Sequence, residues 1–362
     1  MRILIDIGHP AHVHMFRCFA KEMQNRGSEV LFTCRDKEFE IKLLTAYGLN
    51  FINFGKKSKS SIGKIFDLIK FNWNEWRVAK KFRPDVFLSH GSITASHVAW
   101  LMNKPSIAFE DTFNMEQIRL WEPMVSSILT SMYNNPLKSK KVVRYKGYNE
   151  LLYLHPNRLT SNKDILQKLQ VNENEKYVIL RFVSWGATHD KGHTGMSYEN
   201  KVLAVKEFSK YAKVFISSEK PLPADLEKYR IPIQAEEMHD AMANASLIFG
   251  ESATMVAEGV VMGVPGIYLD NTGRLYTQEF EEVYNMCYNY SESDTDQHLA
   301  IQKGIKILQS DNPTIFAEQR QKLINDNVDV TNFLVWFVEN YPASAKETKE
   351  KQEDTSFWAQ FK

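Results

Sequence analysis

The chain has 362 residues but only three cysteines, Cys18, Cys34 and Cys287, which lie far apart with no CxxC spacing. Three such residues cannot build a disulfide framework or a cysteine-based zinc site, and a reducing compartment suits them best. The apolar run at the N-terminus ends after a few residues at Asp6 and Gly8, and no small-residue cleavage site follows. We therefore expect no secretory signal peptide.

Long apolar runs and an excess of one charge are also missing. No window approaches 18 uninterrupted apolar residues, so no membrane-spanning helix is expected. The 45 Lys and Arg residues nearly balance the 44 Asp and Glu residues, which leaves a net charge of +1. A global field that would attract nucleic acid is therefore absent, and we expect no nucleic-acid partner. These features predict a cytoplasmic protein, with contact to the inner membrane face left open.

Short apolar segments alternate with amphipathic stretches along the chain, which is typical of parallel sheets with crossover helices. The expected strands are 2–7, 29–33, 51–54, 86–89, 106–109, 177–183, 214–217, 246–249 and 266–269. The pattern breaks over 148–176, so it predicts an α/β fold of two Rossmann-like, doubly wound domains that face each other across a cleft. The expected bounds are 1–160 for an acceptor domain, 172–325 for a nucleotide-sugar domain, and 326–362 for a C-terminal helix and tail. The charge-mixed stretch 344–356 is predicted to be mobile, and the aromatic end 357–361 to dock.

The first loop, Gly8 to His14, places three histidines between a strand and a helix. Histidine exchanges protons near neutral pH, so His12 is a candidate general base, with His9 and His14 as candidate substrate-binding residues. One alternative is a structural role for all three rings. Another is a zinc site shared by His12 and His14. The sequence identifies no third ligand, and we expect no metal.

A second informative segment runs from Gly250 into a helix. Ser252, Ala253 and Thr254 are small, so a ligand can approach the backbone, and the following helix N-terminus suits a diphosphate. Glu251 and Glu258 flank this stretch as candidate nucleotide contacts. The alternative is an ordinary strand–helix joint with Ser and Thr caps and a solvated Glu258.

Further candidates follow other strands, where ligands of open α/β sheets bind. Glu110 and Asp111 are candidate catalytic carboxylates that would orient His12 or bind an acceptor hydroxyl, against capping or solvated roles. Candidate nucleotide-binding arginines are Arg181 and Arg274, and candidate substrate-binding residues are Gly91, Ser92 and His189.

The stretch 56–83 contains nine Lys and Arg residues against two acidic ones, interleaved with aromatic and aliphatic residues. Apolar positions three and four apart with basic flanks are typical of an amphipathic helix that lies on anionic lipid. The alternative is a helix that packs its apolar face into the core and leaves its basic face in solvent.

Landmarks along most of the chain carry a family resemblance. They are Ile5–Asp6, Pro10–Arg17, Ser89–Ser92, Pro105–Asp111, Gly147–Glu150 with Tyr153–Leu154, and Thr254–Pro265. On these motifs the chain is identified as a member of domain-of-unknown-function family 354, which is regarded as glycosyltransferase-B-like. The 250–265 segment also resembles the donor-binding stretch of the lipid-linked N-acetylglucosaminyltransferase of peptidoglycan synthesis. That resemblance implies that Glu258 binds the ribose and that residues 252–254 bind the diphosphate.

The resemblance implies a glycosyltransferase with the glycosyltransferase-B architecture, and we expect it to work without a metal because the helix N-terminus and Arg181 would stabilise the leaving diphosphate. It would move a sugar from a nucleotide donor, in our interpretation a UDP-sugar used as co-substrate without a cofactor, to a saccharide or lipid-linked acceptor in surface polysaccharide synthesis. Two alternatives remain at this point. One is a non-hydrolysing sugar-nucleotide epimerase, similar to UDP-N-acetylglucosamine 2-epimerases, and the other is a nucleotide sensor without catalysis.

Overall fold

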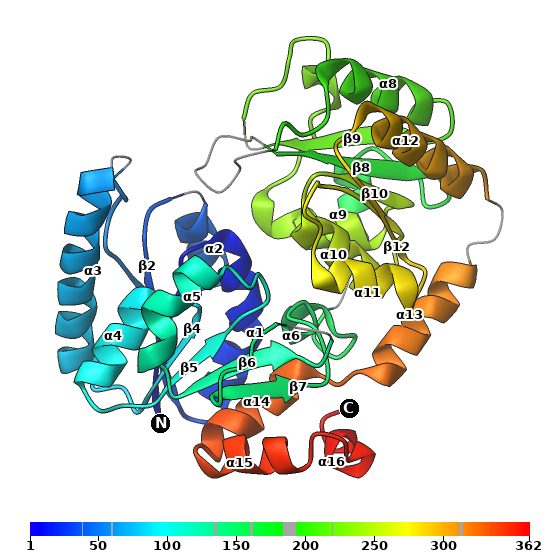
Figure 1. Ribbon diagram of the computed structural model, residues 1–362. Helices are drawn as coiled ribbons and strands as arrows, with labels where there is room; N and C mark the ends of the chain where they lie inside the picture. Colours follow the sequence, from blue (N-terminus) through cyan, green and yellow to red (C-terminus); the bar gives the residue numbers. More distant parts are fainter. Residues whose placement is uncertain are drawn as a thin grey trace. The chain divides into compact units, whose positions relative to one another are not determined.

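The computed structural model describes residues 1–37, 39–58, 61–133, 136–159, 162–183, 193–218, 220–310 and 314–362. The chain forms two compact units. Unit 1 comprises 1–153 together with 327–362, and unit 2 comprises 154–326. Each unit contains one parallel sheet with helices packed against it (Figure 1).

Unit 1 contains a seven-stranded sheet in the order β3-β2-β1-β4-β5-β6-β7, with every neighbouring pair parallel. The strands are β1 (Arg2–Asp6), β2 (Glu29–Cys34), β3 (Phe51–Asn53), β4 (Val86–His90), β5 (Ser106–Phe109), β6 (Ser127–Ser131) and β7 (Val142–Tyr145). Its helices are α1 (Pro10–Asn25), α2 (Glu40–Ala46), α3 (Ser61–Phe82), α4 (Ile93–Leu101), α5 (Met115–Trp121), α6 (Leu151–Leu154), α14 (Val330–Glu339), α15 (Ala343–Glu350) and α16 (Thr355–Ala359).

Alternate residues of β5 show how helices cover both faces of this sheet, because successive side chains of a strand point to opposite sides. Ala108 packs with Ile118 and Trp121 of α5. Phe109 points to the other face, where its ring centroid lies 5.8 Å from that of Phe16 on α1. The sheet is therefore buried on both faces, which explains its apolar strands.

Unit 2 contains a five-stranded parallel sheet in the order β12-β11-β10-β8-β9. The strands are β8 (Tyr177–Phe182), β9 (Lys213–Ser218), β10 (Leu247–Gly250), β11 (Gly266–Leu269) and β12 (Cys287–Tyr290). The helices are α7 (Asp164–Lys168), α8 (Tyr198–Phe208), α9 (Met238–Ala243), α10 (Ala253–Met262), α11 (Leu275–Glu282), α12 (Asp294–Gln309) and α13 (Thr314–Asp326). Phe249 packs edge-to-face on Phe208 of α8 at 5.2 Å, while Ile248 faces α10.

The predicted α/β class with two doubly wound parallel sheets is confirmed. The sequence analysis missed β6, β7 and β12. β6 carries three hydroxyl side chains among its five residues, and β12 reads Cys-Tyr-Asn-Tyr, so neither shows the aliphatic run that predicts a buried strand. Within the described part of the chain, no helix combines the length and apolarity needed to cross a bilayer.

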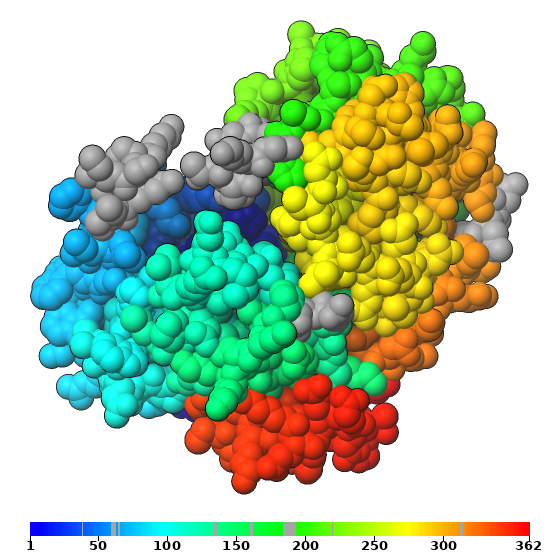
Figure 2. Space-filling view, in the orientation of Figure 1, coloured from blue at the N-terminus to red at the C-terminus, as the bar shows by residue number. Residues whose placement is uncertain are grey.

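The prediction of a mobile segment over 344–356 is wrong. Helix α15 occupies most of it and packs beside β7, where Ser344 and Thr348 are fully buried. The Ser344 hydroxyl donates to the Phe337 carbonyl at 2.6 Å. Small polar side chains make the inward face of this helix, so apolar periodicity could not reveal it. The predicted docking of the aromatic end is confirmed, since Trp358 is buried with its ring 5.5 Å from Phe333. In Figure 2 these C-terminal helices, in red, adjoin the green-cyan part of unit 1.

Candidate functional site

The first loop of unit 1 turns from β1 into α1 at the carboxyl edge of the sheet. His9 caps the helix, because its Nδ1 accepts the Ala11 N–H at 3.2 Å. His12 is half-buried, and its Nδ1 accepts the Gly8 N–H at 3.3 Å. A neutral imidazole has one donor and one acceptor nitrogen, so this contact places the lone pair on Nδ1 and the proton on Nε2.

His12 stacks on His90, the last residue of β4, with ring centroids 4.7 Å apart. His90 Nε2 lies 3.0 Å from Asp111 Oδ1. Burial by itself would lower the pKa of His90, but the Asp111 carboxylate and, more weakly, Glu110 raise it to about 9. Burial and the neighbouring His90 together hold the pKa of His12 well below its usual value. At neutral pH the His90 ring is therefore protonated and the His12 ring is neutral.

A chain of hydrogen bonds fixes the Asp111 carboxylate from the side opposite His90. Asn149 Nδ2 donates to Asp111 Oδ2 at 2.5 Å, and the Tyr145 hydroxyl donates to Asn149 Oδ1 at 2.7 Å. Asp111 thus orients His90 rather than His12, which differs from the sequence-based expectation. The sequence offered a signal for His90, since it ends a buried strand beside the strand that precedes Asp111.

Glu110, expected to be catalytic, holds the loop after β5 instead. Its Oε1 accepts the Thr112 N–H and hydroxyl, both at 2.8 Å, and the Phe113 N–H at 2.7 Å. Gly91 packs against the same carboxylate with a positive φ of 55°, and a Cβ there would lie 3.4 Å from Glu110 Oε2. Glu110 therefore fixes the conformation of the loop after β5, and Gly91 packs against this loop at the carboxyl edge of the sheet.

A buried network that the sequence analysis missed lies beneath these loops. Asp6 accepts hydrogen bonds from Thr33 Oγ1 at 2.9 Å, from Arg35 and from the Ser92 hydroxyl. Ser92 also caps α4 through the Ala95 N–H. Ser92 was expected to bind substrate, and in the structure its hydroxyl joins β1 to the start of α4. The residues of this network come from the ends of three strands that are far apart in the chain, so no local sequence pattern indicates it.

The position of His14 does not suit the predicted role in substrate binding. It is buried within unit 1, with its Nδ1 3.2 Å from the Tyr47 hydroxyl and its ring stacked on Tyr153. His12 and His14 both lie in α1, where residues two apart point to different sides. The zinc alternative assumed an extended segment, and the helix separates the two rings.

In unit 2 the bend after β10 meets the backbone of β8 closely. Gly250 has φ of 144°, and a Cβ there would lie 2.1 Å from the Arg181 carbonyl oxygen. Ser252 caps α10 through the Met255 N–H. Ala253 and Thr254 are half-exposed, and among the described residues no hydrogen bond uses their N–H groups. Free N–H groups at a helix N-terminus are a ready anion site.

Glu251, predicted to contact the nucleotide, is buried and holds the loop after β8. Its Oε2 accepts the Val183 N–H at 2.7 Å and its Oε1 accepts the Met196 N–H at 2.6 Å. Both ends of this loop are therefore bound to one carboxylate. His189 belongs to the part of the loop, 184–192, that lies outside the described residues.

Glu258, predicted to bind ribose, is buried in unit 2, and its Oε1 lies 2.9 Å from Nε2 of His239 on α9. Residues Met255–Met262 of α10 are all buried, so this helix presents no solvent face beyond its first turn. The sequence assigned Glu258 to the ribose from its place one turn into the helix and from the family resemblance. In the structure its carboxylate joins α10 to α9.

Three other groups meet at the carboxyl edge of unit 2. His193 Nδ1 lies 2.5 Å from Glu292 Oε1 and 3.9 Å from Asp270 Oδ2. Burial would raise the pKa of both carboxyls, but hydrogen bonds hold each pKa below its usual value: Asp270 accepts from Thr272 and Gly273, and Glu292 from His193, Thr194 and Gly195. Within the described part of the chain, this trio is the group whose ligand atoms, all within 4.8 Å of one another, could hold a cation.

The two predicted arginines lie at the same edge of unit 2. Arg181 Nη1 donates to Ser217 Oγ at 3.1 Å, and its backbone pairs with Gly250 of β10. Arg274 is half-exposed at the start of α11, where Nη1 donates to the Gly273 carbonyl at 3.0 Å. The structure thus brings Arg181 beside the 250–254 bend.

A family model described as "Protein of unknown function (DUF354)" matches residues 1–308. The chain belongs to this family. A curated relative from Clostridioides difficile (strain 630) is 23% identical over 306 residues, which are 79% of this chain and 74% of the relative. It is a UDP-N-acetylglucosamine–N-acetylmuramyl-(pentapeptide) pyrophosphoryl-undecaprenol N-acetylglucosamine transferase.

Solved structures share the fold of this family member at low identity. A putative UDP-N-acetylglucosamine 2-epimerase from Listeria monocytogenes has a TM-score of 0.64 at 13% identity, covering 92% of this chain and 94% of that one. The spinosyn rhamnosyltransferase SpnG complexed with thymidine diphosphate has a TM-score of 0.58 at 13% identity, covering 90% and 96%. The predicted glycosyltransferase-B architecture is confirmed, and the chain resembles both transferases and epimerases of this fold.

Proposed function

We propose that this protein is a glycosyltransferase that moves a sugar from a UDP-sugar to a saccharide or lipid-linked acceptor in surface polysaccharide synthesis. The observation that carries the proposal is the start of α10, where Ala253 and Thr254 present free N–H groups at the carboxyl edge of a nucleotide-type sheet. The transferase relative from Clostridioides difficile supports sugar transfer as the class of reaction.

In this proposal unit 2 binds the donor. The diphosphate lies on the N–H groups of residues 252–254, where the helix dipole adds positive potential. Arg181, beside the bend, and Arg274, at the start of α11, supply charge-assisted hydrogen bonds to phosphate oxygens or to the donor sugar. Gly250 and the small side chains after it let the ligand reach the backbone. Glu251 supports this site by closing the loop after β8, and Glu258 supports it by holding α9 on α10.

Unit 1 binds the acceptor and supplies the base. Of the two stacked rings only His12 is neutral at neutral pH, so His12 takes the proton of the acceptor hydroxyl. Its lone pair lies on Nδ1, which exchanges the long contact to Gly8 for the acceptor hydroxyl. His90, kept protonated by Asp111, stabilises negative charge on the substrate. His9 and Gly91 lie along the same edge and contact the acceptor.

The transfer step balances without a cofactor. The acceptor oxygen attacks the anomeric carbon, the bond from that carbon to the diphosphate oxygen breaks, UDP leaves, and His12 takes the hydroxyl proton. The negative charge that develops on the leaving diphosphate is stabilised by the N–H groups at the start of α10 and by Arg181, so the proposed mechanism needs no metal.

One observation favours a second candidate, a non-hydrolysing sugar-nucleotide epimerase. Such a reaction needs acid and base groups beside the bound sugar, and His193, Asp270 and Glu292 form such a set in unit 2. The full chain incubated with UDP-sugars distinguishes the two reactions. UDP release that requires an acceptor supports the transferase, whereas an isomerised UDP-sugar formed without acceptor supports the epimerase.

The donor site is tested by Ala253→Asp, with UDP binding measured by calorimetry. A carboxylate in the first turn of a helix stabilises the helix but repels a diphosphate, so we expect unchanged folding and at least about tenfold weaker UDP binding. Ala317→Asp, in the exposed first turns of α13, makes the same chemical change away from the site and should bind UDP as the wild type does. Equal UDP binding by the Ala253→Asp protein would contradict the assigned site.

The acceptor side is tested by His12→Ala. This change should lower turnover at least about a hundredfold, in line with loss of a general base, while UDP affinity stays nearly constant. A fall in UDP affinity with normal turnover at saturating donor would reverse the two assignments.

A further inference from the structure

Helix α3 carries an unusual set of exposed side chains. From residue 66 onward, where its side chains are described, the exposed ones are Phe66, Ile69, Lys70, Trp73, Arg77, Lys80 and Lys81. Three are large apolar residues, four are cations, and none is acidic. The exposed fractions of Phe66, Ile69 and Trp73 are 68%, 63% and 57%, so these residues do not belong to the core.

The seven residues share one face of the helix. At about 100° per residue they fall within roughly 120° of one another. The apolar side chains lie between residues 66 and 73, and Arg77, Lys80 and Lys81 follow them toward the end of the helix. The opposite face packs into unit 1, where Phe71 and Ala79 are buried. The alternative that the apolar residues of this stretch face the core is therefore true of one face only.

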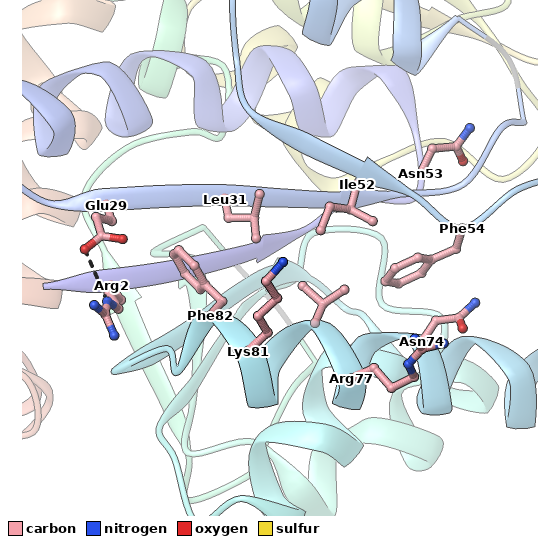
Figure 3. Close-up of a pocket in the computed structure, with 11 residues that line it drawn as sticks. Arg2, Glu29, Leu31, Ile52, Asn53, Phe54, Asn74, Arg77, Lys81 and Phe82 are labelled. Atoms are coloured by element: carbon pink, nitrogen blue, oxygen red, sulfur yellow. Dashed lines mark hydrogen bonds and ion pairs between the residues drawn. The ribbon is translucent and has the colours of Figure 1, made fainter.

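A groove lies along the flank of this face. It has a volume of about 650 Å³ and lies between α3 and the sheet strands β2 and β3 (Figure 3). Leu31 and Ile52 from the strands and Val78 and Phe82 from the helix supply its apolar lining. Its cationic residues include Arg77 and Lys81, which also belong to the exposed face of α3.

We propose that the exposed face of α3 binds the surface of an anionic membrane. Phe66, Ile69 and Trp73 enter between the headgroups, while Lys70, Arg77, Lys80 and Lys81 contact lipid phosphates. Contiguous exposed apolar residues mark interaction sites, and the charge of this face selects the partner. Cations in line with apolar residues fit a phosphate layer over hydrocarbon, and none of the exposed side chains of α3 from residue 66 onward is a carboxylate that such a layer would repel.

The geometry favours lipid over nucleic acid. Base stacking uses free aromatic faces, but Ile69 is aliphatic, and Trp73 already stacks on Trp76 with ring centroids 4.9 Å apart. Lys80 Nζ lies 4.9 Å from the centroid of the Trp76 ring, so the Trp76 ring contacts a cation as well as Trp73. The inference concerns where the protein works and does not depend on which sugar it transfers.

The test is cosedimentation of the full chain with vesicles of phosphatidylcholine alone and of equimolar phosphatidylglycerol and phosphatidylcholine. The wild type should bind the anionic vesicles at least about tenfold more tightly, and added salt should weaken this binding. Tryptophan emission should shift to the blue on binding, and the shift should be lost in Trp73→Phe.

Two double variants separate the contributions of the face. Phe66→Ser with Trp73→Ser removes the apolar part, and Arg77→Ala with Lys81→Ala removes cations; each should lower binding at least about tenfold. The matched control is Leu299→Ser with Lys306→Ala on α12, an exposed apolar residue and an exposed lysine of unit 2, which should bind as the wild type does. Thermal unfolding checks that each variant is folded.

Equal binding to both kinds of vesicle, or unchanged binding by both folded α3 variants, overturns the proposal. Binding of a single-stranded RNA oligonucleotide through α3, with no vesicle binding, also overturns it and identifies a nucleic-acid partner instead.

Discussion

Asp111→Asn tests the charge state of the stacked histidine pair. In the folded protein the pKa of His90 is about 9, against 6.5 for an unperturbed histidine. This difference corresponds to roughly 3 kcal/mol of folding free energy. A pKa raised on folding stabilises the protein fully below pH 6.5, and the contribution is lost as pH rises through about 9. Asparagine keeps the shape of the side chain but removes the charge that raises the pKa of His90.

The expected result is a stability gap that closes with pH. Below pH 6.5 the Asp111→Asn protein should be less stable than the wild type by up to roughly 3 kcal/mol, and above pH 9 the two should be similar. Urea unfolding followed by tryptophan emission measures this in unit 1, because six of the seven tryptophans, all except Trp185, belong to that unit. A gap that stays constant across this pH range would refute the assigned pairing of His90 with Asp111.

Two further predictions concern unit 2. Gly250→Ala should lower the free energy of unfolding by roughly 3 kcal/mol, because its Cβ would lie 2.1 Å from the Arg181 carbonyl oxygen. Gly273→Ala, also at positive φ but with its nearest atom 3.7 Å away, should cost only about 1 kcal/mol, and equal losses in thermal unfolding would contradict this reading of the bend. Turnover should persist after treatment with EDTA. Loss of turnover that Mn²⁺ or Mg²⁺ restores would instead assign a metal to His193, Asp270 and Glu292, and would rule out the metal-independent mechanism.

Most of the strands that the sequence predicted, with the edge strand β3 as an exception, have aliphatic residues buried on both faces. β1 and β8 are examples, because a parallel sheet covered by helices needs apolar side chains at every position. β6 was missed because Ser127 and Thr130 are buried there as hydroxyls. Helix α15 was missed for the same reason. Burial of small polar groups leaves no periodic apolar pattern in a sequence.

The candidate site was predicted at the level of loops and not of side chains. The loops after β4, β5 and β10 lie at the carboxyl edges of their parallel sheets, where ligands bind, and the sequence analysis predicted candidate residues in those loops. It could not tell which carboxylates face solvent. Glu110, Glu251 and Glu258 each bind groups within their own unit, and Asp111 binds His90. Such pairings depend on side-chain directions that are set only after the strands and helices have packed.

Unit 1 consists of two segments that are far apart in the chain, and this has a consequence for how the protein folds during synthesis. Unit 1 is assembled from residues 1–153 and 327–362. The two segments are hydrogen-bonded to each other, because the Val328 N–H donates to the Lys146 carbonyl and the Thr331 hydroxyl donates to the Leu152 carbonyl. Unit 2 is continuous and leaves the ribosome complete, while the earlier-made part of unit 1 still lacks the aromatic residues Phe333 and Trp358 that cover Tyr145 and its surroundings. The half that is translated first is therefore the half that finishes folding last, and a truncation or a bulky fusion at the carboxyl terminus would harm the domain that begins the chain.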